Sequence, residues 1–124
     1  MILVDTSVWV DHLRSGDAAL SAALERSEVL MHPAVLGEVA LGNLADRDEI
    51  LTSMSALPRA VVADDREVVA LVDSVPLHGR GIGYVDACLL AAARLTADAT
   101  LWTRDARLAL AATHLGVGSS VSPP

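Results

Sequence analysis

Residues 1–13 read MILVDTSVWVDHL, and this stretch decides the fold. Residues 2–4 form a short aliphatic run, which is typical of a strand buried on both faces of a parallel sheet. The run ends at Asp5, and apolar side chains return at helical spacing over residues 7–15. A buried strand that leads directly into a helix indicates an α/β protein. It also leaves a carboxylate where the strand ends, either as a helix cap or as part of a site.

Strands and helices alternate along the rest of the chain. This alternation predicts a three-layer α/β/α fold, in which helices flank a central parallel β-sheet on both faces. Residues 59–63 are ambiguous, and HGRGIG at residues 78–83 predicts a glycine-rich loop. The expected strands cover residues 2–5, 29–32 and 99–103, and the expected helices cover residues 7–15, 17–27, 33–45, 46–57, 64–75, 84–95 and 104–116.

Length and composition favour a single domain. A chain of 124 residues, 52% of them hydrophobic, can bury a core without metal or disulfide staples. No repeat or linker divides it, so we expect one domain over residues 1–118 and a flexible tail over residues 119–124. No run approaches the roughly 20 apolar residues of a membrane-spanning helix. The single cysteine, Cys88, lies in an apolar run, which favours a reduced thiol and a cytoplasmic protein.

The charge balance excludes several classes of function. Nine basic residues stand against 16 acidic ones, which gives a formal charge of −7, and every basic residue is arginine. A chain without lysine can use neither Schiff-base chemistry nor a P-loop. The negative charge argues against an extended positive surface for DNA, and three aromatic residues are too few for a stacking platform. Bound divalent cations reverse the local sign, however, so the charge does not exclude a nucleic acid as partner.

Four carboxylates stand among apolar residues instead of in polar clusters. Asp5 and Asp105 each follow an apolar strand, so they meet at one edge of the sheet if those two strands are neighbours. Glu38 lies in the middle of an apolar helix, and Asp86 opens the most apolar helix. An unpaired carboxylate in such surroundings requires a cation, a hydrogen-bond donor or a raised pKa. Together the four would form an oxygen-only cluster suited to Mg²⁺ or Mn²⁺ and to phosphoryl-transfer chemistry.

Each of these acids also has an ordinary structural explanation. Asp5 and Asp105 can be helix N-caps, and Asp86 can complement the positive end of its helix. Glu38 can occupy an exposed helix face. All four explanations would have to hold together, so a shared metal site is the favoured interpretation.

Four segments carry a resemblance to a known family. They are MILVDTSVWVDHL, VLGEVALG around Glu38, GRGIGYVDACLLAAARL and LWTRDARL, in this order. With them the chain resembles the PIN-domain ribonucleases over nearly its whole length, and most closely the VapC toxins of bacterial toxin–antitoxin pairs. The resemblance implies a PIN-like fold and a metal-dependent endoribonuclease with a four-carboxylate site. The matching positions here are Asp5, Glu38, Asp86 and Asp105, so none of the acids is missing.

The resemblance also implies roles for these acids. We expect Asp5, Asp86 and Asp105 to ligate one or two Mg²⁺ or Mn²⁺ ions, and Glu38 to ligate a second ion or to orient the attacking water.

Several neighbouring residues are expected to support this chemistry. Ser7 and Thr103 each lie two residues from a strand-end aspartate, where their hydroxyls can hold carboxylates or waters in place. Thr6 is expected to serve as a cap. Substrate phosphates require further cations, and the candidates are Arg80, Arg104 and Arg107, whose alternative explanation is a solvated surface.

The family further implies partners: an RNA substrate, a second copy of the chain in a homodimer, and an antitoxin that places an arginine in the acidic cluster. No membrane is implied. A phosphoaspartyl phosphatase or a receiver domain is disfavoured, because both rely on a lysine and the phosphatase needs an aspartate where Ser7 stands. GRGIG lacks the full spacing of a dinucleotide-binding loop. The alternative function is a PIN-like module that binds RNA or protein without cleaving.

Overall fold

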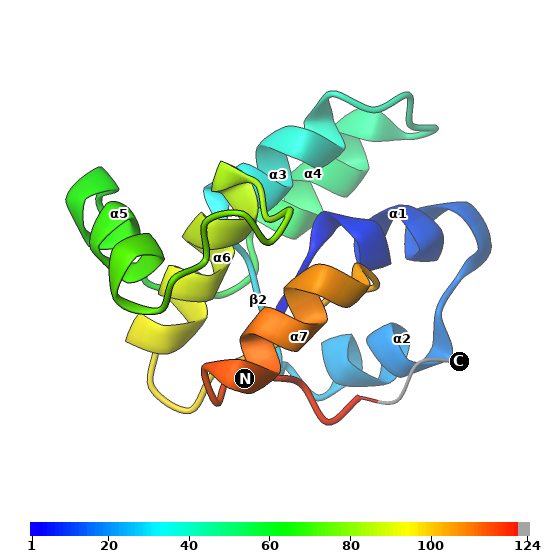
Figure 1. The fold of residues 1–124 in the computed structure, drawn as a ribbon. Coiled ribbons are helices and arrows are strands. Elements are labelled where there is room, and N and C mark those ends of the chain that lie inside the picture. The colour runs from blue at the N-terminus through cyan, green and yellow to red at the C-terminus, as the bar shows by residue number, and fades with distance from the viewer. Residues whose placement is uncertain (122–124) are drawn as a thin grey trace.

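The computed structural model describes residues 1–121, and residues 122–124, part of the expected tail, lie outside the described residues. Its centre is a parallel sheet of three strands in the order β2-β1-β3, flanked by helices in the expected three-layer arrangement (Figure 1). The strands are β1 (Ile2–Val4), β2 (Val29–Leu30) and β3 (Thr100–Trp102), and the helices are α1 (Thr6–Ser15), α2 (Ala18–Glu25), α3 (Pro33–Ala40), α4 (Arg47–Ser55), α5 (Asp65–Ser74), α6 (Tyr84–Leu95) and α7 (Ala106–His114).

The register of the central strand brings two strand ends together. Ile2 pairs with Thr100 and Val4 with Trp102, and the Asp5 N–H donates to the Trp102 carbonyl at 2.9 Å. Parallel strands that end together present their next residues at one edge of the sheet. Asp5 and the residues after Trp102 therefore leave the sheet side by side.

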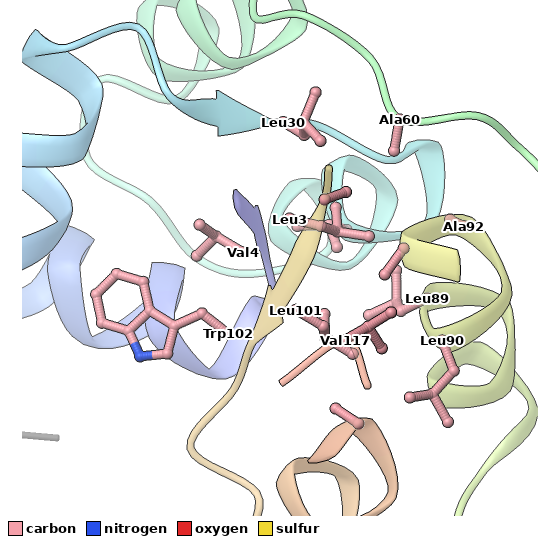
Figure 2. Packing of buried hydrophobic residues seen from close by; sticks show 14 of the residues in the cluster. Leu3, Val4, Leu30, Ala60, Leu89, Leu90, Ala92, Leu101, Trp102 and Val117 are labelled. Carbon is pink, nitrogen blue, oxygen red and sulfur yellow. The ribbon is translucent and has the colours of Figure 1, made fainter. Parts of the chain in front are cut away.

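The core packs on both faces of this short sheet. Leu3 and Leu101 point toward α6, where Leu89 is fully buried, while Val4 and Trp102 point to the opposite side (Figure 2). This alternation follows from the pleat of a strand, whose successive side chains face opposite ways. Because both faces of the sheet are covered, β1 has no polar residue before Asp5. Among the described residues, no helix is both long and apolar enough to cross a bilayer.

Two local expectations need correction or completion. The helix expected over residues 33–45 ends at Ala40, because Gly42 and Asn43 favour a turn over further helix. The ambiguous residues 59–63 begin with a single parallel bridge between Arg59 and Met31, so they extend the sheet beyond β2. A similar bridge joins Leu101 to Gly118 on the other side.

The first turn of α3 is held by a histidine. Pro33 occupies the start of the helix as expected, and the Ala34 N–H donates to Nδ1 of His32 at 3.0 Å. This bond requires an unprotonated Nδ1. His32 is buried, and burial together with the nearby charge of Arg59 lowers the pKa of its imidazole. The neutral ring is therefore the form that caps α3.

Candidate functional site

Asp5 is the most buried acid at the carboxyl edge of the sheet, with 7% of its surface exposed. Its Oδ2 accepts hydrogen bonds from Ser7 Oγ at 2.8 Å and from Thr103 Oγ1 at 2.7 Å. Asp5 stands at the N-cap position of α1, yet its side chain makes no capping bond. The two hydroxyls, rather than the helix, therefore hold this carboxylate.

The same hydroxyls are themselves fixed by the backbone. The Arg104 N–H donates to Ser7 Oγ at 3.0 Å, and the Asp105 N–H donates to Thr103 Oγ1 at 3.0 Å. Each hydroxyl thus accepts a backbone hydrogen bond and can direct its own hydrogen to Asp5. The loop after β3 is tied to the start of α1 through one small network.

Glu38 reaches the site from α3. Its Oε1 accepts a hydrogen bond of 2.9 Å from Thr6 Oγ1, across the packing of α1 against α3. Thr6 therefore donates to an acid, whereas the sequence predicts that it caps its helix. Glu38 is exposed, although its sequence neighbours are apolar, because this face of α3 is open to solvent.

Asp86 connects the four acids electrostatically. It is half-buried at the start of α6, and burial is the main cause that raises the pKa of its carboxyl group. The charges of Asp5, Asp105 and Glu38 raise it further, against the lowering effect of a hydrogen bond from the Gly83 N–H. Asp86 thus responds to all three of the other acids.

Asp105 caps α7. Its Oδ1 accepts hydrogen bonds from the backbone N–H groups of Arg107 at 2.9 Å and Leu108 at 3.2 Å. The ordinary explanation for this aspartate is therefore realised at one oxygen. Since a carboxylate has two oxygens, capping through Oδ1 leaves Oδ2 for another partner.

The chemistry of this donor set fits a hard divalent cation. No ion pair within residues 1–121 involves any of the four acids, because the paired arginines contact other carboxylates. Oxygen-only ligands with unbalanced negative charge suit Mg²⁺ or Mn²⁺. As the side chains stand, however, no three of the potential ligands in the described part of the chain are close enough to share one ion. The acids form an electrostatic cluster whose side chains would have to rotate to enclose a metal.

The structure changes the interpretation of Arg104. Its Nε lies 2.7 Å from Asp11 Oδ2, and its Nη2 donates to Asp17 Oδ2 at 2.6 Å. A hydrogen bond from the Leu20 N–H is the main cause that lowers the pKa of the Asp17 carboxyl, and Arg104 lowers it further. Arg104 therefore links the loop after β3 to α1 and to the start of α2.

Arg80 and Arg107, the other two candidates for phosphate contacts, lie together. They line a hollow of about 250 Å³ with Leu110 and Ala111, and within residues 1–121 neither forms an ion pair. The Arg107 side chain crosses Gly81, where an added Cβ would approach Nη1 to 2.5 Å. Gly81 also has a φ of +73°, a conformation that favours glycine. The absence of a side chain at Gly81 thus lets the Arg107 guanidinium pack against the loop.

Sequence reasoning missed the contacts that join distant segments. Thr6 and Glu38 are 32 residues apart, and Arg104 and Asp17 are 87 residues apart. The apolar runs that end near Asp5 and Asp105 predict which strand ends meet. The side-chain partners depend on how the helices pack, which these runs do not predict.

Comparisons with known proteins agree with this arrangement. The family model for the PIN domain matches residues 2–113. Ribonuclease VapC32 of Mycobacterium tuberculosis, in strains CDC 1551 / Oshkosh and ATCC 25618 / H37Rv, is 47% identical to this chain over 117 residues. The similarity covers 94% of this chain and 94% of the relative. The match to the family model therefore spans all four acidic positions.

Proposed function

The chain belongs to the PIN-domain family, and from this premise we propose that it is a VapC-type toxin, a metal-dependent endoribonuclease that cleaves RNA phosphodiester bonds at its four carboxylates. The ribonuclease named above, at 47% identity, supports the reaction class. The observation that carries the proposal is the fixed Asp5 carboxylate beside Asp86, whose pKa is raised by burial and by the other three acids.

The proposed roles of the acids follow from their surroundings. Asp5, Asp86 and Asp105 would hold Mg²⁺ or Mn²⁺, and Glu38 would hold a second ion or orient the attacking water. A bound cation of this kind lowers the pKa of water and offsets the charge that develops on the phosphate. Ser7 and Thr103 keep Asp5 in place, and Thr6 does the same for Glu38.

We assign the contacts to substrate phosphates to Arg80 and Arg107. Both have side chains free of carboxylate partners within the described residues, and they share one hollow. Arg104 was a third candidate, but its guanidinium already contacts Asp11 and Asp17. Its proposed role is to position the loop that carries Thr103 and Asp105.

The remaining partners are part of the same proposal. An antitoxin arginine entering the acidic cluster would supply the counter-charge that no described residue provides there. The proposed homodimer is suggested by the family. The proposed cytoplasmic location is suggested by Cys88, a cysteine without a disulfide partner.

The test compares purified wild type with Asp5→Asn on single-stranded RNA, in Mn²⁺ and in EDTA. We expect wild type to cleave only with the metal, and Asp5→Asn to bind RNA without cleaving it. Asp48→Asn is the matched control, because it removes one exposed carboxylate outside the cluster and should cleave like wild type. Wild type that binds RNA but leaves it intact in Mn²⁺ would instead favour the non-cleaving binding module.

A further inference from the structure

A second hollow opens directly beside Glu38. It has a volume of about 310 Å³ and lies between α1, α3 and the loop that joins α3 to α4. Figure 1 shows this loop on the side of the molecule where α1 lies. The apolar part of its wall includes Val10, Leu13, Leu44 and Ile50. The four acids and their hydroxyl partners do not account for this space.

One face of α1 connects the hollow to the acidic cluster. Thr6, Val10 and Arg14 follow one another at four-residue spacing, so they lie in one row along the helix. Thr6 contacts Glu38 at the inner end of the row, and Arg14 lines the hollow about 12 Å farther along. Glu38 belongs to both places. A polymer cut at the acids would therefore place a neighbouring group in this hollow.

The charged residues of the lining bear on the kind of group that fits. Glu38 and Arg14 carry opposite formal charges and no other lining residue is charged, so the hollow has no excess positive charge to hold a backbone phosphate, whereas a neutral nucleobase needs none. The aliphatic wall offers apolar surface for the faces of a base. A base, rather than a backbone phosphate, is the part of RNA that matches this lining.

Two polar side chains in the lining can read the edge of a base. Asn43 and Arg14 both line the hollow, and Arg14 takes part in no ion pair within the described residues. Asparagine pairs bidentately with N6 and N7 of adenine, and arginine with O6 and N7 of guanine. Pyrimidines have no N7. The pair of side chains therefore matches a purine.

We propose that this hollow binds an unpaired purine base next to the cleaved bond, and that Asn43 and Arg14 determine the preference for it. The inference rests on the proposed endoribonuclease function and adds a specificity subsite to it.

The experiment digests a pool of single-stranded RNA of randomised sequence in Mn²⁺ and sequences the ends that cleavage produces. Wild type should show a purine preference at one position beside the cut. Asn43→Asp keeps the shape of the side chain but replaces its amide donor with an acceptor, so the preference for adenine should fall about five- to a hundredfold. Arg14→Ala should lower the preference for guanine in the same way. Thermal unfolding of each variant checks that the fold is unchanged.

The control is Arg94→Ala, which removes an exposed arginine of α6 that does not line the hollow, and its cleavage profile should match that of wild type. Wild type without a purine preference would overturn the inference, as would an unchanged preference in Asn43→Asp and Arg14→Ala, which would leave the hollow to a protein partner. Wild type that shows no metal-dependent cleavage at all would overturn the proposed function and this subsite together.

Discussion

At the scale of single residues, the position of Asp5 depends on two hydroxyl groups from opposite ends of the chain. Ser7 comes from the start of α1 and Thr103 from the end of β3, and both donate to the same carboxylate oxygen. Two donors on one oxygen restrict the rotation of the carboxylate and leave its second oxygen to face a ligand. Groups that orient metal ligands in this way commonly contribute strongly to activity.

Replacing these hydroxyls should reduce cleavage without unfolding the protein. We expect Ser7→Ala and Thr103→Val each to lower the metal-dependent rate about 10- to 100-fold, because Asp5 loses one of its two donors. Steady-state cleavage of one RNA over a range of Mn²⁺ concentrations measures the effect, which should be partly offset by more metal. Thr52→Val, on the exposed face of α4, is the control. A Thr103→Val protein with the metal dependence of wild type would contradict the role of this hydroxyl.

Asp86 should show the conflict between activity and stability. Burial and neighbouring acids raise the pKa of Asp86 above its ordinary value of 3.8, so its ionised form costs folding free energy at neutral pH. Asp86→Asn should therefore unfold at a higher urea concentration than wild type at pH 7 in EDTA, while losing cleavage. The gain should shrink as the pH falls through the raised pKa, and it should vanish below 3.8, where both states of wild type are protonated. Asp73→Asn, an exposed change in α5, should leave the urea midpoint close to that of wild type at every pH.

At the scale of elements, the site is assembled from strand ends and helix starts. Asp5 and Asp105 follow β1 and β3, whereas Glu38 and Asp86 are carried by α3 and α6. The sequence predicted the strand-end pair, because apolar strands and their carboxyl ends are visible as a pattern. Glu38 and Asp105 are both exposed, although their sequence neighbours are apolar. An apolar neighbourhood in the sequence does not reveal which helix face another element covers.

Arg104 should prove to be a structural link between elements. Arg104→Ala removes the contacts to Asp11 and Asp17 and leaves the largely buried Asp17 carboxylate without its cation. We expect a loss of about 1–2 kcal/mol in the free energy of unfolding, since part of the pair with Asp11 is exposed to solvent. Urea unfolding measures it. Arg26→Ala breaks the exposed pair with Glu28 and should change stability far less. Equal effects of the two changes would show that the Arg104 contacts are ordinary surface pairs.

The cap of α3 should make stability depend on pH. The pKa of His32 is lowered below its ordinary value of 6.5, so the folded protein favours the neutral ring. The contribution of His32 to the free energy of unfolding is then fully present above pH 6.5, and it is lost as the pH falls through the lowered pKa of the folded state. His32→Asn keeps a capping acceptor that does not titrate, so its urea midpoint should fall less between pH 7 and pH 5. His114→Asn, an exposed change at the end of α7, should retain the pH dependence of wild type.

At the scale of the whole molecule, a formal charge of −7 with no lysine leaves the acidic cluster without an internal counter-ion among the described residues. Helix packing brings the four acids close enough to influence one another, so their mutual repulsion is concentrated at one edge of the sheet. Composition could predict the excess of negative charge. It could not predict that every ion pair of the described residues would form elsewhere, because that outcome depends on which arginines the packed helices bring near which acids.

Divalent cations should therefore stabilise the folded chain. A ligand that binds only the folded state adds about 2.7 kcal/mol at a hundred times its dissociation constant. We expect Mn²⁺ to raise the thermal midpoint of wild type, EDTA to reverse the rise, and Asp5→Asn to reduce it strongly. Asp48→Asn removes the same formal charge outside the cluster and should keep the rise. A rise of equal size in Asp5→Asn would indicate that the cations act on the general surface charge.

The pairing of β1 with β3 limits where this protein can change in length. Inserting one residue within Ile2–Val4 or Thr100–Trp102 would turn every following side chain to the other face of the sheet and would separate Asp5 from Thr103. Residues 41–46 and 76–83 lie in connections between helices, where insertions are tolerated best. These connections carry Asn43 and Arg80, two of the residues proposed to contact RNA. A change in the length of these connections would thus move two proposed RNA contacts while leaving the strand register that places Asp5 beside Thr103.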